Sequence, residues 1–383
     1  MEEKKKLGKF DIYSMGVGGT IGSGIFVMMG VGIAFTGRSI SLAVGIGCIY
    51  MLLAYLFHPI MASMFTLPGG DYDMRGMVCG PLLTGTSAIL TALSGVGASA
   101  YGLAIVDYVG VIVPGVLAYR QILASLIIIL AFAATFKGSK LMAIINNCMT
   151  VILLASIALF IVFGLPKVQP GYFTNDGFFL EGFGGFIGAI SIMSFACQGS
   201  TITPVNMMAD TNQPRRTIPM MIPWIALTVG VVYAFMGVVA SGALPVEQVA
   251  GQSLAVVAQS IFPRWLFVVF VLGGAVFAIG SSLMAFVAMM RNPLQQIAHD
   301  GWLPAIFKKK TKSGYPYMTQ LLFFLVSVLP IVFDFTLDAV VSLAMIPSMA
   351  LNLYMNLYLI RLVKNIPNSG KTASSMCQRR FSM

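Results

Sequence analysis

The sequence predicts an all-α integral membrane protein with ten transmembrane helices, and three observations support this prediction. Of the 383 residues, 58% are hydrophobic and only 9% are charged, whereas soluble domains contain about 25% charged residues. Apolar runs of about 20 residues, the length that crosses a bilayer as a helix, recur along the chain. The basic residues gather in alternate loops between these runs.

The apolar runs also predict how the chain is organised. An odd number of spans in each half makes the second half enter the membrane in the opposite direction, as in an inverted repeat. We therefore expect a 5+5 inverted repeat: a cytoplasmic N-terminus (1–10), the first repeat (11–165), an extracytoplasmic loop (166–184), the second repeat (185–363) and a cytoplasmic polar tail (364–383). The predicted spans are 12–36, 40–64, 82–113, 119–136, 141–165, 185–209, 219–242, 264–290, 317–333 and 338–362.

The positions of the basic residues predict the orientation. If the N-terminus is cytoplasmic, all basic residues except Arg38, Arg120, Lys167 and Arg264 lie in cytoplasmic segments, as the positive-inside rule describes. The net charge of +10 then reflects topology beside anionic lipid headgroups and not a nucleic-acid partner. The charged start of the chain predicts no cleavable signal. We expect a protein of the cytoplasmic (plasma) membrane with both termini in the cytoplasm.

The cysteines and histidines predict no metal centre. The cysteines show no paired spacing, so neither a disulfide framework nor a zinc site is indicated. The two histidines, His58 and His299, lie far apart in the sequence. The cysteine positions are Cys48, Cys79, Cys148, Cys197 and Cys377.

The first span contains the unusual stretch GGTIGSGIF, from Gly18 to Phe26. Glycine costs about 1 kcal/mol relative to alanine inside a helix. Small residues four apart, such as Gly18 and Gly22, let helices pack closely. Alternatively, the helix is interrupted at Gly22-Ser23-Gly24, and its exposed main-chain groups line a cavity or are buried in protein. Both interpretations fit the sequence at this point.

An interrupted helix has its own binding chemistry. The half-helix after the break points free N–H groups and its positive dipole end at the gap, which suits a carboxylate. The carbonyls before the break suit an ammonium group or a cation. An α-amino acid carries both charges, so a broken helix can hold it without a charged side chain. The sixth span offers a second candidate break in SFACQGS, Ser194 to Ser200.

Three motifs occur in order along the chain: IGSGIF in the first span, NQPRRTIP after the sixth and RNPLQQIAHDGWLP (Arg291 to Pro304) after the eighth. Together they resemble the motifs of the amino acid–polyamine–organocation (APC) superfamily of transporters. The resemblance implies the leucine-transporter fold, with the substrate between broken first and sixth helices. Many relatives continue for two further spans, so we expect this chain to lack the last two transmembrane helices of those relatives.

The resemblance also implies where a substrate would bind. The N–H groups that begin the second half of the first helix are expected to meet the substrate carboxylate, and carbonyls at both breaks its ammonium group. Phe195 and Gln198 are expected to shape or gate the side-chain pocket. The full set of predicted substrate-binding residues is Thr20, Ile21, Gly22, Ser23, Gly24, Ile25, Phe195, Ala196, Cys197, Gln198 and Gly199.

Three further residues are candidates for coupling to an ion. Ser281 and Ser282 in the eighth span offer oxygen ligands for Na⁺, although such serines commonly bond to their own helix. Asp107 lies inside an apolar run, where a carboxylate is costly and suits proton coupling, or else it lies near enough to the outer surface to be hydrated. Leu153 stands where some proton-coupled relatives carry a lysine, so that arrangement is not expected.

Two other polar residues at the inner ends of spans are expected to have ordinary roles. His58 is expected to be hydrated or bonded to the backbone. Asp210 is expected to pair with Arg215 or Arg216 at an inner gate, or to be a solvated loop charge.

These observations predict a secondary active transporter of amino acids that works by alternating access, with no cofactor, either as a symporter coupled to Na⁺ or H⁺ or as an exchanger (antiporter). The alternative is a polyamine or amine exchanger of the same fold. A channel or receptor-like protein would need charged rings or a sensing domain, and an enzyme would need a catalytic constellation. No acidic residue stands at the proposed sixth-span break, which favours neutral amino acids. The sequence does not predict the oligomeric state.

Overall fold

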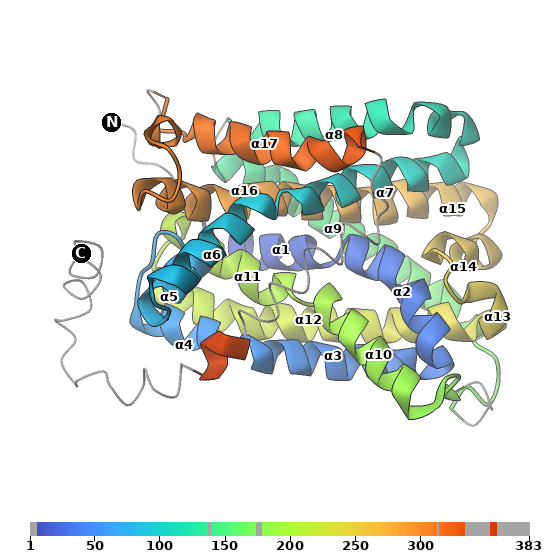
Figure 1. Ribbon diagram of the computed structural model, residues 1–383. Helices are drawn as coiled ribbons and strands as arrows, with labels where there is room; N and C mark the ends of the chain where they lie inside the picture. The colour runs from blue at the N-terminus through green and yellow to red at the C-terminus, as the bar shows by residue number, and fades with distance from the viewer. Residues whose placement is uncertain (1–5, 137–138, 174–177, 312–313, 334–352, 358–383) are drawn as a thin grey trace.

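The computed structural model describes residues 6–136, 139–173, 178–311, 314–333 and 353–357. Within these ranges the regular elements are helices, most of them aligned along one direction (Figure 1). Each span predicted before residue 334 is helical, whereas the tenth, 338–362, lies almost entirely outside the described residues. Seven helical stretches of the described chain are long and apolar enough to cross a membrane, and Tyr317–Val332 is a shorter apolar helix.

The first five predicted spans contain more helices than spans because three of them are interrupted. These helices are α1 (Lys9–Thr20), α2 (Ser23–Thr36), α3 (Ile40–Ala54), α4 (Phe57–Met64), α6 (Pro81–Leu93), α7 (Val96–Ile112), α8 (Arg120–Thr135) and α9 (Ser139–Gly164). The short connecting elements here are η1 (Gly37–Ser39), α5 (Asp71–Val78), η2 (Pro114–Tyr119) and η3 (Leu165–Lys167).

The later spans begin with a second interrupted helix and include a π-helical turn. They form α10 (Gly182–Ala196), α11 (Gly199–Asn206), α12 (Pro214–Gly242), α15 (Arg264–Val269), the π-turn η6 (Phe270–Val276), α16 (Phe277–His299) and α17 (Tyr317–Val332). The connections contain η5 (Met208–Asp210), α13 (Val246–Val249), α14 (Leu254–Ile261) and η7 (Ala305–Lys308).

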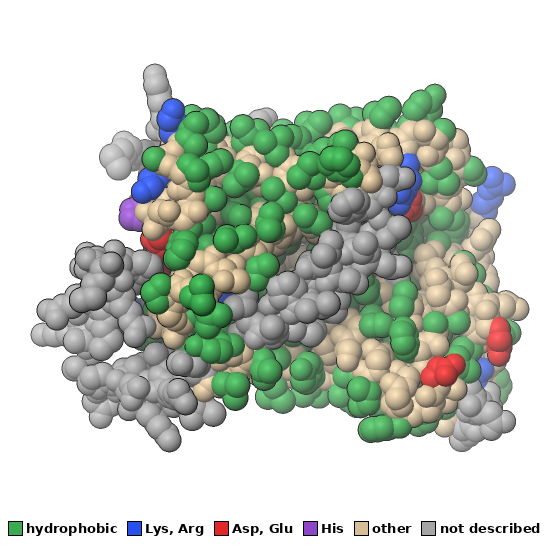
Figure 2. Space-filling view, in the orientation of Figure 1, with side chains coloured by type: hydrophobic (Ala, Val, Ile, Leu, Met, Phe, Trp, Pro, Cys, Tyr) green, Lys and Arg blue, Asp and Glu red, His purple; other side chains and the backbone are tan. Residues whose placement is uncertain are grey.

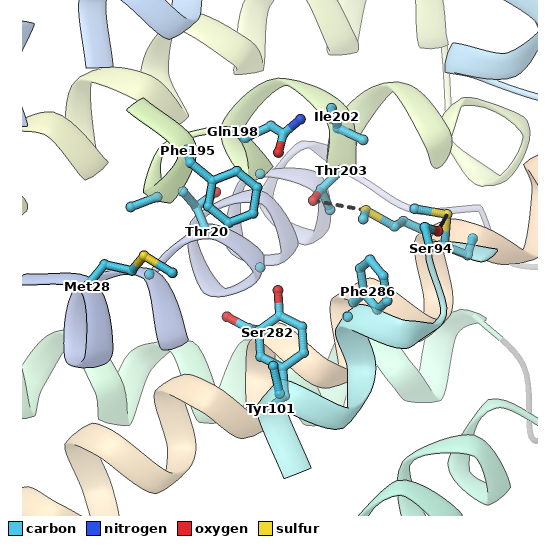
Figure 3. A pocket seen from close by; sticks show the side chains of 18 residues that line it. Thr20, Met28, Ser94, Tyr101, Phe195, Gln198, Ile202, Thr203, Ser282 and Phe286 are labelled. Atoms are coloured by element: carbon cyan, nitrogen blue, oxygen red, sulfur yellow. Dashed lines mark hydrogen bonds between the residues drawn. The ribbon is translucent and has the colours of Figure 1, made fainter. Parts of the chain in front are cut away.

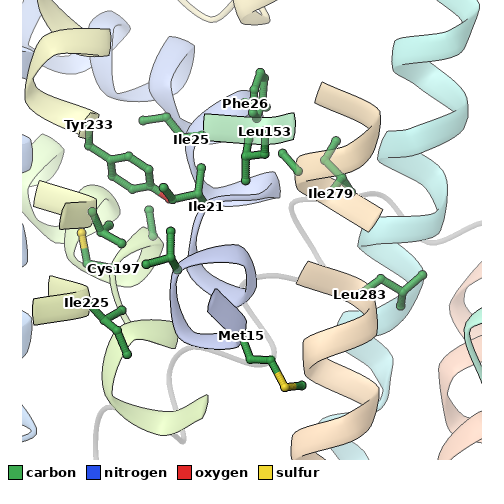
Figure 4. Close-up of a cluster of buried hydrophobic side chains, with 14 of the residues drawn as sticks. Met15, Ile21, Ile25, Phe26, Leu153, Cys197, Ile225, Tyr233, Ile279 and Leu283 are labelled. Carbon is green, nitrogen blue, oxygen red and sulfur yellow. The ribbon is translucent and has the colours of Figure 1, made fainter. Parts of the chain in front are cut away.

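The two interrupted helices lie in the core of the bundle. Helix α1 contacts α11 and is surrounded by α9, α12 and α16 (Figure 1). Around its end, the side chains of Ile21, Ile25, Phe26 and Tyr233 are fully buried (Figure 4). The breaks are therefore in the protein interior and do not face lipid.

The outside of the bundle is apolar. Leu82, Ile122, Val162 and Phe183 are all more than half exposed. Figure 2 shows apolar side chains over the middle of the visible face, with charged side chains toward its two ends. Such a surface is costly in water and favourable in lipid. The protein is therefore an integral membrane protein.

One cysteine pair corrects the sequence analysis. Cys48 of α3 and Cys197, at the end of α10, form a disulfide with their Cα atoms 5.5 Å apart. The two residues are separated by 149 positions, so their spacing gave no sign of a pair. They meet because α3 packs along α10.

The N-terminal segment before α1 packs at one end of the bundle, here called the N-terminal end. The N–H of Leu7 donates to the carbonyl of Asp210 (2.8 Å), and the N–H of Asn212 donates to the carbonyl of Leu7 (2.9 Å). The carboxylate of Asp210 forms an ion pair with Arg291 of α16. The sequence analysis expected Asp210 to pair with Arg215 or Arg216, whereas α16 brings Arg291 to η5 as an ion-pair partner.

Helix α5 joins this end to the C-terminal end of α16. The hydroxyl of Tyr72 donates to Oδ2 of Asp300 (3.0 Å), and the N–H of Gly69 donates to Oδ2 of Asp73 (2.7 Å). Burial raises the pKa of Asp73 to about 6, with the Gly69 N–H opposing and the Asp300 charge adding to the rise. Arg291 and Asp300, both from the third sequence motif, thus bind η5 and α5 at the same end of the bundle.

We predict that Asp73→Asn removes a pH dependence of stability. The pKa of Asp73 rises from 3.8 to about 6 on folding, so the folded state keeps this proton to higher pH. Its stabilising contribution is complete below pH 3.8 and is lost as the pH rises through about 6. An asparagine keeps an acceptor for Gly69 and has no charge to bury. Thermal unfolding of the detergent-purified wild type and variant, compared between pH 4 and 7, tests this prediction. The same pH dependence of the unfolding temperature in both proteins would contradict it.

Candidate functional site

The first interrupted helix breaks at Ile21 and Gly22, slightly earlier than predicted. The N–H of Ile21 still donates to the carbonyl of Val17 (2.8 Å), and the N–H of Phe26 donates to the carbonyl of Gly22 (3.2 Å). The N–H groups of the first turn of α2, at Ser23, Gly24 and Ile25, have no acceptor within their own helix. They are donors at the positive end of a helix dipole.

The second interrupted helix breaks at Cys197 and Gln198, between α10 and α11. The N–H of Cys197 donates to the carbonyl of Ser194 (3.0 Å), which ends α10. The carbonyl of Cys197 accepts from the N–H of Ser200 (3.2 Å) and from its hydroxyl (2.7 Å). The predicted SFACQGS break is therefore present, but the Cys197 carbonyl already has two donors.

Glycines allow the two breaks to touch. A Cβ on Gly24 would lie 3.0 Å from both Cα and Cβ of Ala196. A Cβ on Gly199 would lie 2.9 Å from Oγ1 of Thr20. Gly18 packs as closely, since its Cβ would lie 2.3 Å from Oγ1 of Thr150. Both interpretations of the glycine-rich stretch hold, because the same helix is interrupted and closely packed.

A cavity of about 210 Å³ lies where the two breaks meet. Figure 3 shows Phe195, Tyr101 and Phe286 facing this space, with Thr20 and Ser282 at its edge. Within the part of the chain that the structure describes, the lining residues carry no charged side chain, and most are apolar. They are Gly19, Thr20, Gly24, Met28, Ser94, Gly97, Ala100, Tyr101, Phe195, Ala196, Gln198, Gly199, Ile202, Thr203, Ser282, Phe286, Met289 and Met290.

The structure brings only part of the predicted set to the cavity wall. The predicted residues that line it are Thr20, Gly24, Phe195, Ala196, Gln198, Gly199 and Ser282. Ile21, Ile25 and Cys197 are buried in the core instead (Figure 4). Gly22 packs on Ser282, where a Cβ would lie 2.0 Å from its hydroxyl oxygen. The side chains of Ile21, Ile25 and Cys197 therefore pack in the core and do not line the cavity.

Two serines of α16 form hydrogen bonds with the main chain of the broken first helix. The hydroxyls of Ser281 and Ser282 both donate to the carbonyl of Gly18, at 3.0 and 2.8 Å, and Ser281 also contacts the carbonyl of Ala278 at 2.9 Å. Hydroxyl and carbonyl oxygens are ligands that a hard cation accepts. Among the described residues, no group of three or more His, Cys, Asp or Glu side chains is placed to hold a metal ion.

Asp107 lies away from this cavity. Its carboxylate binds Arg120 through two hydrogen bonds, of 2.6 and 2.9 Å, and the carboxylate side chain is 43% exposed. A carboxylate that is partly hydrated and paired costs little to hold in the protein. The burial cost that made Asp107 a candidate for proton coupling is therefore small.

Several residues at the site were missed by sequence reasoning. Tyr233 of α12 donates its hydroxyl to the carbonyl of Thr20 (2.8 Å), one of the carbonyls expected to meet an ammonium group. Gln198 donates to the hydroxyl of Tyr55. Tyr101 and Phe286 come from long apolar spans, in which no local signal marks the residues that face inward.

Comparison with known proteins identifies the family. A family model described as "Amino acid permease" matches residues 7–378. The chain belongs to this amino acid permease family. Its predicted resemblance to the APC superfamily is thereby confirmed.

Relatives of this permease have several named substrates. It is 24% identical to the branched-chain amino acid permease of Bacillus subtilis (strain 168), over 84% of this chain and 73% of the relative. It is 26% identical to the methylthioribose transporter of the same organism, over 80% of this chain and 69% of the relative. It is 25% identical to human cationic amino acid transporter 4, over 57% of this chain and 38% of the relative.

We predict that Gly24→Leu closes the cavity between the two breaks. The added side chain overlaps Ala196, and overpacking of this kind costs about 1–3 kcal/mol. A penalty of this size at the site lowers ligand affinity about 5- to 150-fold. Ligand binding is measured by thermal stabilisation of the purified permease.

Gly45→Leu in α3 is the matched control, because a Cβ there meets no other atom within 4 Å. It should fold and bind as the wild type does. Undiminished binding by Gly24→Leu would show that the cavity is not the site.

Proposed function

We propose that this permease is a secondary active transporter of amino acids with uncharged, apolar side chains, and that it holds the substrate on the main chain of its two broken helices. The observation that carries this proposal is the cavity at the contact of the breaks, which Gly24 in the first turn of α2 lines and where none of the described lining residues is charged. Membership of the amino acid permease family supports amino acid transport in general.

The substrate's charged groups fit the two kinds of main-chain end. The carboxylate binds the N–H groups of Ser23, Gly24 and Ile25, at the positive end of α2. The ammonium group binds carbonyls at the C-terminal ends of α1 and α10. The carbonyl of Thr20 already accepts from Tyr233 and keeps a second lone pair for this purpose.

The side-chain part of the cavity suits an apolar group. Phe195, Tyr101, Phe286 and Met28 supply an apolar wall, where burial of a substrate side chain is worth roughly 25 cal/mol per Å². A cationic amino acid or a polyamine would bury a charge with no acidic partner in this wall, at a large cost. The polyamine exchanger is therefore the less favoured function.

The proposed topology follows from the paired breaks. The broken helices are the first spans of the two predicted halves, as expected of a 5+5 inverted repeat. The N-terminal end of the bundle, with its surrounding basic residues, faces the cytoplasm by the positive-inside rule. Alternating access arises by movement of helices about the two breaks. The Asp210–Arg291 ion pair closes the cytoplasmic side.

We predict that a neutral apolar amino acid such as L-leucine raises the thermal stability of the detergent-purified permease. A ligand that binds only the folded state, at about 100 times its Kd, contributes about 2.7 kcal/mol. The standard amino acids and common polyamines are compared with and without Na⁺.

Gly24→Leu serves as the variant that should be stabilised less than the wild type in this comparison. Stabilisation by lysine, arginine or polyamines alone would overturn the proposed substrate class. Dependence on Na⁺ would assign a cation to the oxygen atoms around Ser281 and Ser282.

A further inference from the structure

A buried cluster of titratable groups lies next to the N-terminal end. His58 of α4 is fully buried, and its Nε2 lies 2.9 Å from Oδ1 of Asp71. Oδ2 of Asp71 lies 2.6 Å from Nη2 of Arg75. The N–H of Asp71 donates to Oδ1 of Asn206 at the end of α11 (2.9 Å). The expectation that His58 is hydrated or bonded to the backbone is therefore wrong, because α5 places Asp71 against α4.

The cluster adjoins the proposed substrate cavity through a second cavity. This second cavity, of about 100 Å³, is lined by Asp71 and Arg75. It shares three lining residues with the first cavity: Ser94, Ile202 and Met290. A substrate that moves from the breaks toward the N-terminal end would pass this wall.

A chain of contacts also connects His58 with the break of the sixth span. Gln198 lines the first cavity and donates to the hydroxyl of Tyr55. The ring of Tyr55 lies 4.9 Å, centroid to centroid, from the ring of His58. The imidazole is thus one aromatic ring away from a residue of the proposed substrate site.

The geometry leaves one position on His58 for a proton. An ionised carboxylate only accepts hydrogen bonds, so Nε2 carries the hydrogen that points at Asp71. The other nitrogen, Nδ1, is then a lone-pair acceptor, and it is buried without a hydrogen-bond partner among the described residues. Leaving a buried acceptor unpaired costs about 1–3 kcal/mol. A proton bound at Nδ1 would make the imidazole cationic.

The charges of the cluster balance without that proton. Burial alone would raise the pKa of Asp71, but the positive charge of Arg75 and the hydrogen bond with His58 outweigh it and lower the pKa below its usual value. Asp71 is therefore ionised beside Arg75, and the pair is neutral. A protonated His58 would compete with Arg75 for the same carboxylate.

We propose that the His58–Asp71 pair binds the proton that drives transport, and that Arg75 links this proton to the substrate. This inference rests on the proposed function. The carboxylate of an amino acid in the second cavity pairs with Arg75 and draws it from Asp71. The uncovered Asp71 charge is then balanced by a proton that Nδ1 of His58 takes from water on the extracytoplasmic side, the side from which the substrate entered. The proton is released to cytoplasmic water when the substrate leaves and Arg75 pairs with Asp71 again.

Among the described residues, the other groups around His58 do not provide an alternative proton site. Helix α11 has no charged residue, and its neighbour here is Asn206. The charged residues of α12 are Arg215 and Arg216 at its start, where Arg215 donates to Thr66 beyond the end of α4. Asp73 on α5 faces Gly69 and Asp300 instead, so it serves as a control.

The decisive experiment compares net transport with exchange in proteoliposomes, using L-leucine. His58→Gln keeps an N–H donor toward Asp71 but cannot bind a proton. We expect it to retain leucine counterflow, which needs no net proton movement. We also expect it to lose leucine accumulation driven by a pH gradient and the accompanying proton entry. Asp73→Asn should keep both activities.

Two results of this experiment would overturn the inference. One is pH-driven accumulation by His58→Gln at the wild-type level. The other is leucine transport by the wild type without proton entry. Absence of leucine counterflow in the wild type would instead contradict the proposed function, so the two failures are distinguishable.

A second measurement uses the wild type and so does not depend on how the His58→Gln variant folds. The chain has two histidines, and the side chain of His299 is 80% exposed, so ¹⁵N-histidine NMR of the wild type reports on one buried and one exposed imidazole. A His299→Gln variant assigns the signals. Leucine should move the titration of His58 to higher pH and leave that of His299 unchanged. A His58 signal that does not respond to saturating leucine would refute the link between proton and substrate.

Discussion

The arrangement of this permease depends on one constraint: main-chain groups freed by a helix break inside a membrane must find partners in the protein. The breaks at Ile21–Gly22 and Cys197–Gln198 meet this requirement by packing against each other in the core. Neighbouring helices complete the arrangement. Tyr233 bonds the Thr20 carbonyl, and the α16 serines bond the Gly18 carbonyl. Gly24, in the first turn of α2, lines the cavity.

The cavity at the breaks and the buried charged side chains occupy different places in the bundle. None of the described residues in the cavity wall is charged, and main-chain dipoles at helix breaks suit a zwitterion. The buried charges of Asp71 and Arg75 lie one cavity farther toward the N-terminal end, where they balance each other beside His58. Recognition and energy coupling would then occupy adjacent parts of the same pathway. The link between them would be the substrate's own carboxylate.

Much of the fold could be predicted because its signals are local. Apolar length predicted the helical spans, and IGSGIF and SFACQGS predicted the two breaks to within about two residues. The sequence could not predict which atoms meet across the bundle. Cys48 and Cys197 form a disulfide, Asp210 pairs with Arg291, and His58 is buried against Asp71. Each of these contacts joins residues on different helices.

The sequence by itself determined the membrane class, the positions of the spans and the glycines that allow helices to break and touch. These properties depend on hydrophobicity and conformational freedom, which belong to the residues themselves. Only the tertiary structure decided which faces of α7 and α16 line the cavity and which polar residues are partnered. Along a span that is apolar on every side, helix rotation is set by packing against neighbours and not by a polar stripe.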